Sequence, residues 1–313
     1  MKKLLLGMMG LLVFTMIGCG GNTTAFSFDA SRNITVYTRD TTSGTRDAFF
    51  TGIDFSDAIT SNGVLVANYV EVDGNGSMIT SVKNDIYGIG YISLASLETS
   101  GLKGLVFDGV AATEANVLNG TYTLKRPFNY MTRAHWSGME RERQIVEAFV
   151  AFMTTIEGIA TIQNKAGIIS VEANTPSWDD IKSLYPVCLE DNSDVTIYFG
   201  GSTSVESVAK ALSQEFSQKC GNFIAEHNHT GSGDAYKRTQ GSEADGGNKL
   251  HIGFASRDFK SSESGDEGTS GFICFDAVVL VVNQANTAID SITKSEAKKV
   301  YSGDKTLWSS LNP

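Results

Sequence analysis

The pattern of apolar and polar positions predicts short strands that alternate with helices. Residues 34–37 supply the β-branched and aromatic side chains of a strand, and residues 141–162 carry apolar side chains at helical spacing. Further strands are predicted at residues 64–72, 86–94, 126–132, 195–199, 223–227 and 252–255, and further helices at 78–84, 205–219, 234–240 and 291–301. Strands that alternate with helices indicate an α/β protein with mostly parallel sheets.

Three other stretches stand out by their pattern. Residues 274–283 (CFDAVVLVVN) form a continuous apolar run, which is typical of a strand buried on both faces. Residues 116–121 resemble a turn, and residues 174–194 lose periodicity and contain two prolines, so we expect a surface connection there.

The first 19 residues predict a signal peptide. Lys2 and Lys3 precede an apolar run at residues 4–17 that is short for a membrane span, and the run ends in Gly18-Cys19. This ending resembles the lipobox of bacterial lipoproteins, in which Cys19 would become the lipidated N-terminus. A plain signal peptide and a core helix are the alternatives. Residues 20–31 are small and polar, as expected of a flexible tether.

Composition narrows the class of protein. The net charge of −10 argues against a nucleic-acid or anionic-lipid surface as partner. After the signal, about 290 residues remain, which suits two lobes of ordinary size. No second apolar run reaches membrane-spanning length. Cys188, Cys220 and Cys274 allow at most one intramolecular disulfide, and their spacing does not resemble a metal site. We expect no metal and no cofactor.

The first predicted strand leads into the loop Thr-Ser-Gly-Thr at residues 42–45, at the start of a helix. Free backbone N–H groups and the helix dipole favour an anion at such a position. Arg39, at the end of the strand, could hold the same anion through its guanidinium. Alternatively, Ser43 is an ordinary helix cap.

Similar loops occur three more times, at Gly-Gly-Ser-Thr-Ser (200–204), Thr-Gly-Ser-Gly (230–233) and Ala-Ser-Arg (255–257). Each follows a predicted strand, and strand-to-helix loops of a parallel sheet gather at one edge, where ligands bind. Hydroxyls and backbone N–H groups dominate these loops. Such donors, together with one or two arginines, suit a small tetrahedral oxyanion.

Five blocks of the sequence resemble the periplasmic phosphate-binding protein family, the substrate-binding component of phosphate ABC transporters. They are ITVYTRDTTSGTRDAFF, VTIYFGGSTSVESVAKALSQEF, TGSGDAY, IGFASRDF and FDAVVLVVN. The resemblance implies a two-lobed periplasmic-binding-protein fold, with mixed, mostly parallel sheets flanked by helices and a ligand cleft between the lobes. It implies phosphate as ligand, a membrane permease as partner, and a lipid-anchored, extracytoplasmic location.

The order of the blocks differs from that family, in which the GSTSV block precedes the SGTRD block. This order suggests a circular permutation in which residues 172–194 join the family's old ends. A truncated tandem repeat is the alternative, although one complete set of blocks argues against it. The permuted arrangement implies one lobe of residues 32–95 plus 280–313, and a second lobe of residues 96–279.

The resemblance also implies the site residues. Matching the blocks assigns anion contacts to Arg39, Ser43, Gly44, Thr45, Thr203, Ser204, Ser232 and Arg257. Arg257 is a departure, because some members carry at this place an Asp that accepts a hydrogen bond from a protonated phosphate. Asp258, Asp47 or Asp40 could replace that acceptor. Arg46 either faces the anion or is a surface charge.

The leading hypothesis is a phosphate-binding protein that serves an ABC importer and is not an enzyme. A protein or sensor for sulfate, molybdate or tungstate is the second hypothesis. A phosphoester hydrolase is the third, and no base beside Ser43 or Ser204 is recognisable in the sequence. The fourth is a purely structural surface lipoprotein, which would make the repeated loops a coincidence.

Overall fold

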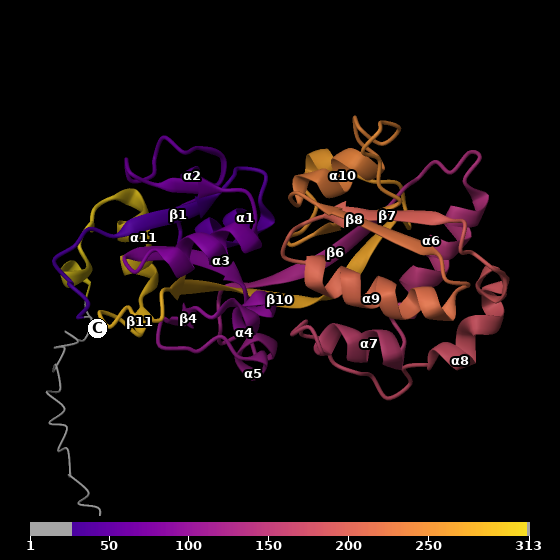
Figure 1. Cartoon of the computed structure of the whole chain (residues 1–313), viewed down its shortest axis with the longest axis horizontal. Coiled ribbons are helices and arrows are strands. Elements are labelled where there is room, and N and C mark those ends of the chain that lie inside the picture. Colours follow the sequence, from indigo (N-terminus) through magenta and orange to yellow (C-terminus); the bar gives the residue numbers. More distant parts are fainter. Residues whose placement is uncertain (1–26, 312–313) are drawn as a thin grey trace, which may run out of the picture.

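The computed structural model describes residues 27–311, which form two lobes side by side (Figure 1). The predicted signal peptide with Cys19, and residues 20–26 of the tether, lie outside these described residues. The last part of the predicted tether is packed, because the ring of Phe28 lies 5.0 Å from that of Tyr87 and 5.8 Å from that of Trp308.

Lobe 1, on the left of Figure 1, is built on parallel strands. β1 pairs with β2 on one side and with β3 on the other. The strands are β1 (Thr35–Arg39), β2 (Val70–Val72), β3 (Gly88–Ser93), β4 (Lys103–Gly104), β5 (Val106–Phe107) and β11 (Ser291–Ile292). The helices are α1 (Gly44–Gly52), α2 (Asp57–Thr60), α3 (Asn75–Asn84), α4 (Leu97–Ser100), α5 (Glu114–Leu118) and α11 (Lys294–Ser302).

Lobe 2 repeats this plan with β7 between β8 and β9, all parallel. Its strands are β6 (Lys125–Thr132), β7 (Thr196–Gly201), β8 (Ile224–His229) and β9 (Ile252–Ala255). Its helices are α6 (Glu140–Phe152), α7 (Ile156–Gln163), α8 (Trp178–Ile181), α9 (Glu206–Lys219) and α10 (Gly233–Thr239).

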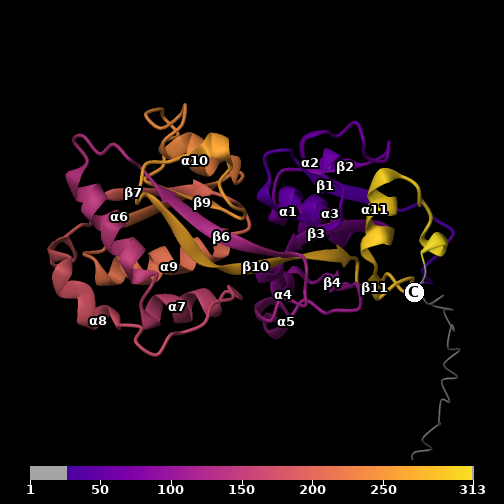
Figure 2. The same cartoon turned by 180° about the vertical axis from the view of Figure 1, so that it is seen from behind.

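One long strand, β10 (Ser270–Val282), joins the lobes into a sheet of order β2-β1-β3-β10-β6-β9-β7-β8. Its residues 278–282 pair antiparallel with β3, and its residues 270–277 pair antiparallel with β6. Figures 1 and 2 show β6 and β10 running together from one lobe into the other. The mixed, two-lobed α/β fold is confirmed, with antiparallel pairs concentrated at the connection.

The apolar run at 274–283 is buried on both faces, as predicted. Val278, Leu280 and Val282 belong to the core under α1 and α11. Val279 and Val281 belong to a smaller core under α3. This alternation follows directly from the two-residue period of a strand. Lobe 2 has a separate core around Phe149 and other residues of α6, α9 and β7.

The single helix predicted at 141–162 is wrong. α6 and α7 are separate helices that meet at 74°, and Thr155 caps α7 by accepting a hydrogen bond from the Gly158 N–H. Gly158 packs so closely that an added Cβ would strike the carbonyl of Phe152. Both helices bury apolar residues in the lobe 2 core. The helical spacing of apolar residues therefore continues through the bend and gives no sign of it in the sequence.

Other elements also differ from their prediction. The strand expected at 64–72 forms only at β2, and the turn expected at 116–121 overlaps helix α5. The connection at 174–194 contains α8, whose Trp178 is buried, and a disulfide joins Cys188 to Cys220. Cys274 is a buried free thiol.

The sequence predicted that the first segment of lobe 1 ends at residue 95, but the core of lobe 1 also includes residues that follow it. Leu105, Val117 and Leu124 belong to the lobe 1 core, because β4 pairs with β10 and β5 pairs with β11. Within residues 27–311 no single helix is long and apolar enough to cross a membrane, and only the bent pair α6 and α7 reaches that length and composition.

Candidate functional site

Three strand-to-helix loops and the loop after β9 meet where the two lobes face each other. The β1–α1 loop comes from lobe 1, and the loops after β7, β8 and β9 come from lobe 2. A Cβ added to Gly44 would collide with Ser232 Oγ and would lie 2.7 Å from Ser256 Oγ. The backbone of the first loop therefore rests directly on hydroxyls of the opposite lobe.

The hydroxyls of these loops form a buried network. Thr45 Oγ1 lies 2.8 Å from Ser204 Oγ, across the lobe boundary. Ser256 Oγ accepts a hydrogen bond from Ser202 Oγ at 2.9 Å and lies 3.2 Å from Ser232 Oγ. The contact between Thr45 and Ser204 joins hydroxyls that are 159 positions apart in the sequence.

Arg39 closes one side of this network. It is almost fully buried, and its Nη1 donates to Thr203 Oγ1 at 3.3 Å across the boundary. Its other donors are fixed by the carbonyls of Val72 and Asp73, at 3.2 and 2.9 Å. Burial lowers the pKa of Arg39, and the nearby carboxylate of Asp40 opposes this shift. The guanidinium is thus held rigidly at the cluster.

A second buried arginine was missed from the sequence. Arg126, at the start of β6, donates to Ser256 Oγ at 3.2 Å and binds Asp276 of β10 at 2.7 and 2.9 Å. Burial raises the pKa of Asp276, and Arg126 opposes that shift. An acidic residue inside the apolar run 274–283 was the signal for such a partner, because a buried charge needs one.

Asn75, at the start of α3, was also missed. Its backbone N–H donates to Thr203 Oγ1 at 3.4 Å, and its Nδ2 donates to Ser204 Oγ at 3.1 Å. It therefore links lobe 1 to the β7–α9 loop. A single Asn after Gly74 carries no sequence signal for this contact, which depends on the position of the other lobe.

Other predicted residues are placed differently. Ser43 caps α1 through its Oγ, which accepts from the Arg46 N–H at 3.3 Å. Arg46 is a buried structural residue, since its guanidinium donates to the carbonyls of Arg39 and Ala58. It is neither a surface charge nor joined by these bonds to the hydroxyl network.

Arg257 binds the carboxylate of Glu263 through both terminal nitrogens, at 2.6 and 2.8 Å. Its Nε lies 3.9 Å from Asp47 of α1, in the opposite lobe. The alternative acceptor Asp258 accepts from Asn129 at 3.2 Å instead. The structure therefore gives Arg257 carboxylate partners, and it shows no hydrogen bond from Arg257 to the described hydroxyls.

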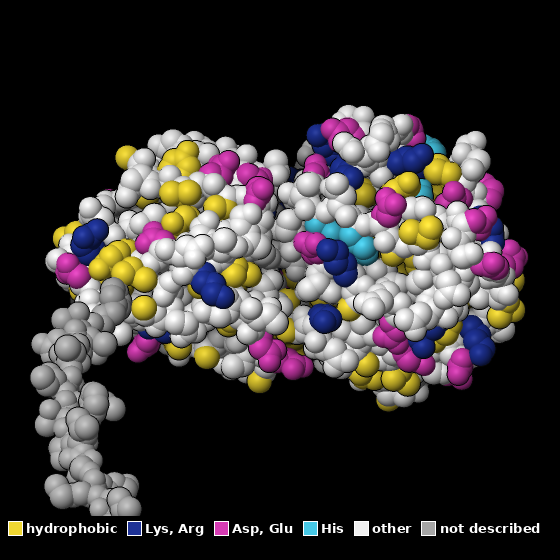
Figure 3. All heavy atoms as spheres, in the orientation of Figure 1, with side chains coloured by type: hydrophobic (Ala, Val, Ile, Leu, Met, Phe, Trp, Pro, Cys, Tyr) yellow, Lys and Arg dark blue, Asp and Glu magenta, His cyan; other side chains and the backbone are white. Residues whose placement is uncertain are grey.

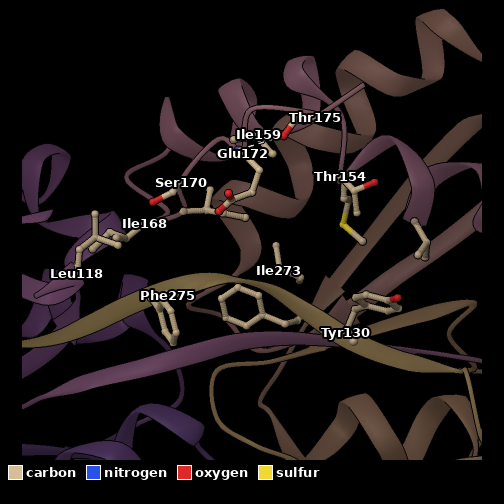
Figure 4. Close-up of a pocket in the computed structure, with 15 residues that line it drawn as sticks. Leu118, Tyr130, Thr154, Ile159, Ile168, Ser170, Glu172, Thr175, Ile273 and Phe275 are labelled. Atoms are coloured by element: carbon tan, nitrogen blue, oxygen red, sulfur yellow. Dashed lines mark hydrogen bonds between the residues drawn. The ribbon is translucent and has the colours of Figure 1, made fainter. Parts of the chain in front are cut away.

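A more spacious cavity lies away from this network. A space of about 520 Å³ opens beside β10, α6 and α7, lined mainly by apolar side chains such as Phe275 and Ile273, with the Glu172 carboxylate (Figure 4). An apolar lining with a carboxylate does not suit a small anion. No group of three or more His, Cys, Asp or Glu residues that could hold a metal occurs within residues 27–311.

Charge over the face seen in Figure 3 is mixed, with lysine and arginine side chains scattered among acidic ones. Arg39 and Arg126 are buried arginines that donate to side chains of the hydroxyl network, and Asp276 neutralises Arg126. Buried donors that converge from two lobes can enclose a small anion and exclude water from it.

Comparisons with known proteins find similar chains. Residues 190–313 match the PBP superfamily domain. The chain is 29% identical to phosphate-binding protein PstS 2 of Streptococcus pneumoniae serotype 4 over 99% of this chain and 98% of the relative. It is 28% identical to the PstS 2 protein of Streptococcus agalactiae serotype V, over 98% of this chain and 95% of that protein.

A solved structure gives the same fold. The phosphate-binding protein of a phosphate ABC transporter from S. pneumoniae TIGR4 superposes with a TM-score of 0.60 at 24% identity, covering 90% of this chain and all of that one. The resemblance predicted from the sequence blocks is confirmed.

Proposed function

We propose that this chain binds inorganic phosphate between its lobes for an ABC-type importer, because residues 190–313 match the PBP superfamily domain and the chain resembles phosphate-binding proteins over nearly its whole length. The observation that supports this most directly is the meeting of four loops at one buried cluster of hydroxyls and arginines. Phosphate is a tetrahedral anion that needs many short donors around it.

The proposed contacts come from both lobes. Lobe 1 offers Arg39, the Thr45 hydroxyl, and the first N–H groups of α1 at Gly44 and Thr45, which lack intrahelical acceptors by position. Ser43 contributes to the site as the N-cap of α1, which orients these N–H groups. The hydroxyls that now bond to one another would turn towards the anion.

Lobe 2 offers Ser204 and Ser232, which were predicted, together with Ser256, which was not. Thr203 holds Arg39 in place. Each hydrogen bond to a charged partner contributes roughly 1.5–3 kcal/mol, so a set of about eight exceeds the cost of association. A dissociation constant in the micromolar range or below follows.

Binding at a lobe boundary implies opening and closing. β6 and β10 are the strands that pass between the lobes, so bending of this pair would separate Thr45 from Ser204. In the closed form a permease would contact both lobes at once. We also propose export to the outside of the membrane and anchoring through lipidated Cys19, which lies outside the described residues.

Titration calorimetry of the purified protein, after bound phosphate has been stripped, tests the proposal. We expect heat from phosphate with a dissociation constant at or below about 10 μM, and much weaker heat from sulfate. Absence of any phosphate signal would reject the proposal. A stronger response to sulfate, molybdate or tungstate would assign the site to that anion.

The hydrolase alternative finds no support in the described contacts. Ser204 Oγ is bonded to Thr45 and Asn75, and Ser43 Oγ accepts from a backbone N–H. Neither serine therefore has a base as hydrogen-bond partner, as nucleophilic catalysis requires. Release of nitrophenol from nitrophenyl phosphate, lost on Ser204→Ala, would reverse this conclusion.

A further inference from the structure

In the carboxamide of Asn75, the nitrogen has a hydrogen-bond partner and the oxygen has none among the described residues. The side chain is almost fully buried, with a relative exposure of 3%. Nδ2 donates to Ser204 Oγ at 3.1 Å, whereas Oδ1 is buried and has no hydrogen-bond partner among the described residues. A buried carbonyl oxygen without a donor costs free energy, so its retention calls for an explanation.

The position of this oxygen is informative. Ser204 Oγ, which holds the amide nitrogen, also lies 2.8 Å from Thr45 Oγ1. The carboxamide therefore lies against the point where the two lobes exchange hydroxyl contacts. It is an acceptor at a cluster that otherwise consists of donors and hydroxyls.

Other acceptors near the site are already engaged. Asp276 uses its two oxygens for Arg126 and Ser93. Asp47 faces Arg257 and Lys260, at 3.9 and 4.0 Å.

Asp40 is the closest rival. Its Oδ1 accepts from the Thr42 N–H at 2.8 Å, and its Oδ2, which lacks a hydrogen bond, stands 3.6 Å from the charged Arg39 Nη2. The arginine charge engages this oxygen, whereas no charged group is paired with the Asn75 oxygen in the described contacts.

We infer that Asn75 Oδ1 accepts a hydrogen bond from the P–OH group of hydrogen phosphate and thereby selects phosphate over sulfate. This inference rests on the proposed phosphate site. Phosphate near neutral pH keeps at least one P–OH group, which can donate to the carbonyl oxygen. Sulfate has no proton at that pH, so its oxygen would face the lone pairs of Oδ1 and leave both unsatisfied.

Asn75→Leu and Asn75→Asp test whether Asn75 selects phosphate as a hydrogen-bond acceptor. Asp40→Asn tests the rival acceptor, Asp40. Dissociation constants for phosphate, arsenate and sulfate are measured by calorimetry and by competition at neutral pH. Arsenate keeps a proton as phosphate does, so it separates protonation from size. Circular-dichroism melting shows whether each variant is folded.

For Asn75→Leu we expect the preference for phosphate over sulfate to fall by about tenfold or more, with arsenate following phosphate. Asn75→Asp retains an acceptor, so the preference survives even if both affinities fall. Asp40→Asn leaves the preference near that of the unchanged protein.

Equal losses for phosphate and sulfate in Asn75→Leu would overturn the inference, as would loss of the preference in Asn75→Asp or in Asp40→Asn. Each of these results leaves the phosphate site itself standing. Failure of the unchanged protein to bind phosphate would instead reject the proposed function, and this inference with it.

Discussion

At the scale of single residues, one glycine has a measurable consequence for the closed site. Gly44 lies so close to the opposite lobe that any side chain there must displace Ser232 or Ser256. We expect Gly44→Ala to weaken phosphate binding by roughly a hundredfold or more, because misplacement at a site of this kind is costly. Calorimetric titration measures the change.

Gly76 provides the matched control. It lies in α3, and an added Cβ there meets no atom within 4 Å. Gly76→Ala should bind phosphate normally. Its unfolding temperature should rise slightly, because alanine is a better helix former than glycine by about 1 kcal/mol. Normal binding in Gly44→Ala would show that the lobes do not approach each other at this point.

At the scale of elements, β8 contains a stack of two histidines behind the β7–α9 loop. His227 Nδ1 lies 3.1 Å from His229 Nε2, and His229 Nδ1 lies 3.0 Å from the Ser202 carbonyl. His227 Nε2 lies 2.9 Å from Ser213 Oγ of α9. These contacts tie an edge strand to the loop that provides Ser204.

This stack makes stability depend on pH. Burial lowers the pKa of His227 from 6.5 to about 3 and that of His229 from 6.5 to about 4. Below pH 6.5 the unfolded chain takes up protons that the folded chain does not, so stability is complete above pH 6.5 and falls towards pH 4. Urea unfolding across this range measures the slope.

The slope should shrink in His227→Gln, because one depressed pKa is then absent. The exposed His135 serves as control, and His135→Gln should leave the slope unchanged. A slope that is the same in both variants would mean that His227 is not buried as a neutral ring in solution.

Periodicity predicted the order of strands and helices because each element buries a face of its own. It failed at Thr155, where two helices continue one apolar pattern around a bend. The loops of the site were predictable from Gly, Ser and Thr after strands. Arg126 and Asn75 were not, because their roles depend on contacts between distant segments.

The chain ends bear on the permutation proposal. Asn33 forms a bridge with Leu307, and the Trp308 N–H donates to the Arg32 carbonyl at 3.3 Å. The first and last described segments therefore lie side by side in lobe 1. This neighbourhood supports the proposal that an ancestral chain once passed directly from one to the other.

At the scale of the whole molecule, charges span the lobe boundary beside the site. Asp47 of α1 faces Arg257 and Lys260 of lobe 2. Asp47→Asn should speed phosphate release by up to about fivefold, because partly exposed pairs contribute roughly 0.2–1 kcal/mol. Stopped-flow release measurements test this, and added salt should reduce the difference.

Asp54 offers a control pair within lobe 1, since its carboxylate binds Lys294 at 2.6 Å. Asp54→Asn should leave the release rate unchanged. If both variants release phosphate at the original rate, the charges around Arg257 do not hold the lobes together.

The long strand β10 also governs when the protein can fold. It supplies residues 278–282 to lobe 1, and α11 (Lys294–Ser302) covers that lobe, although β1 to β3 end by residue 93. During synthesis the first half of the chain thus emerges long before its partners exist. Lobe 1 therefore cannot close until almost the entire polypeptide has been synthesised, and its early strands stay unpaired with their later partners until then.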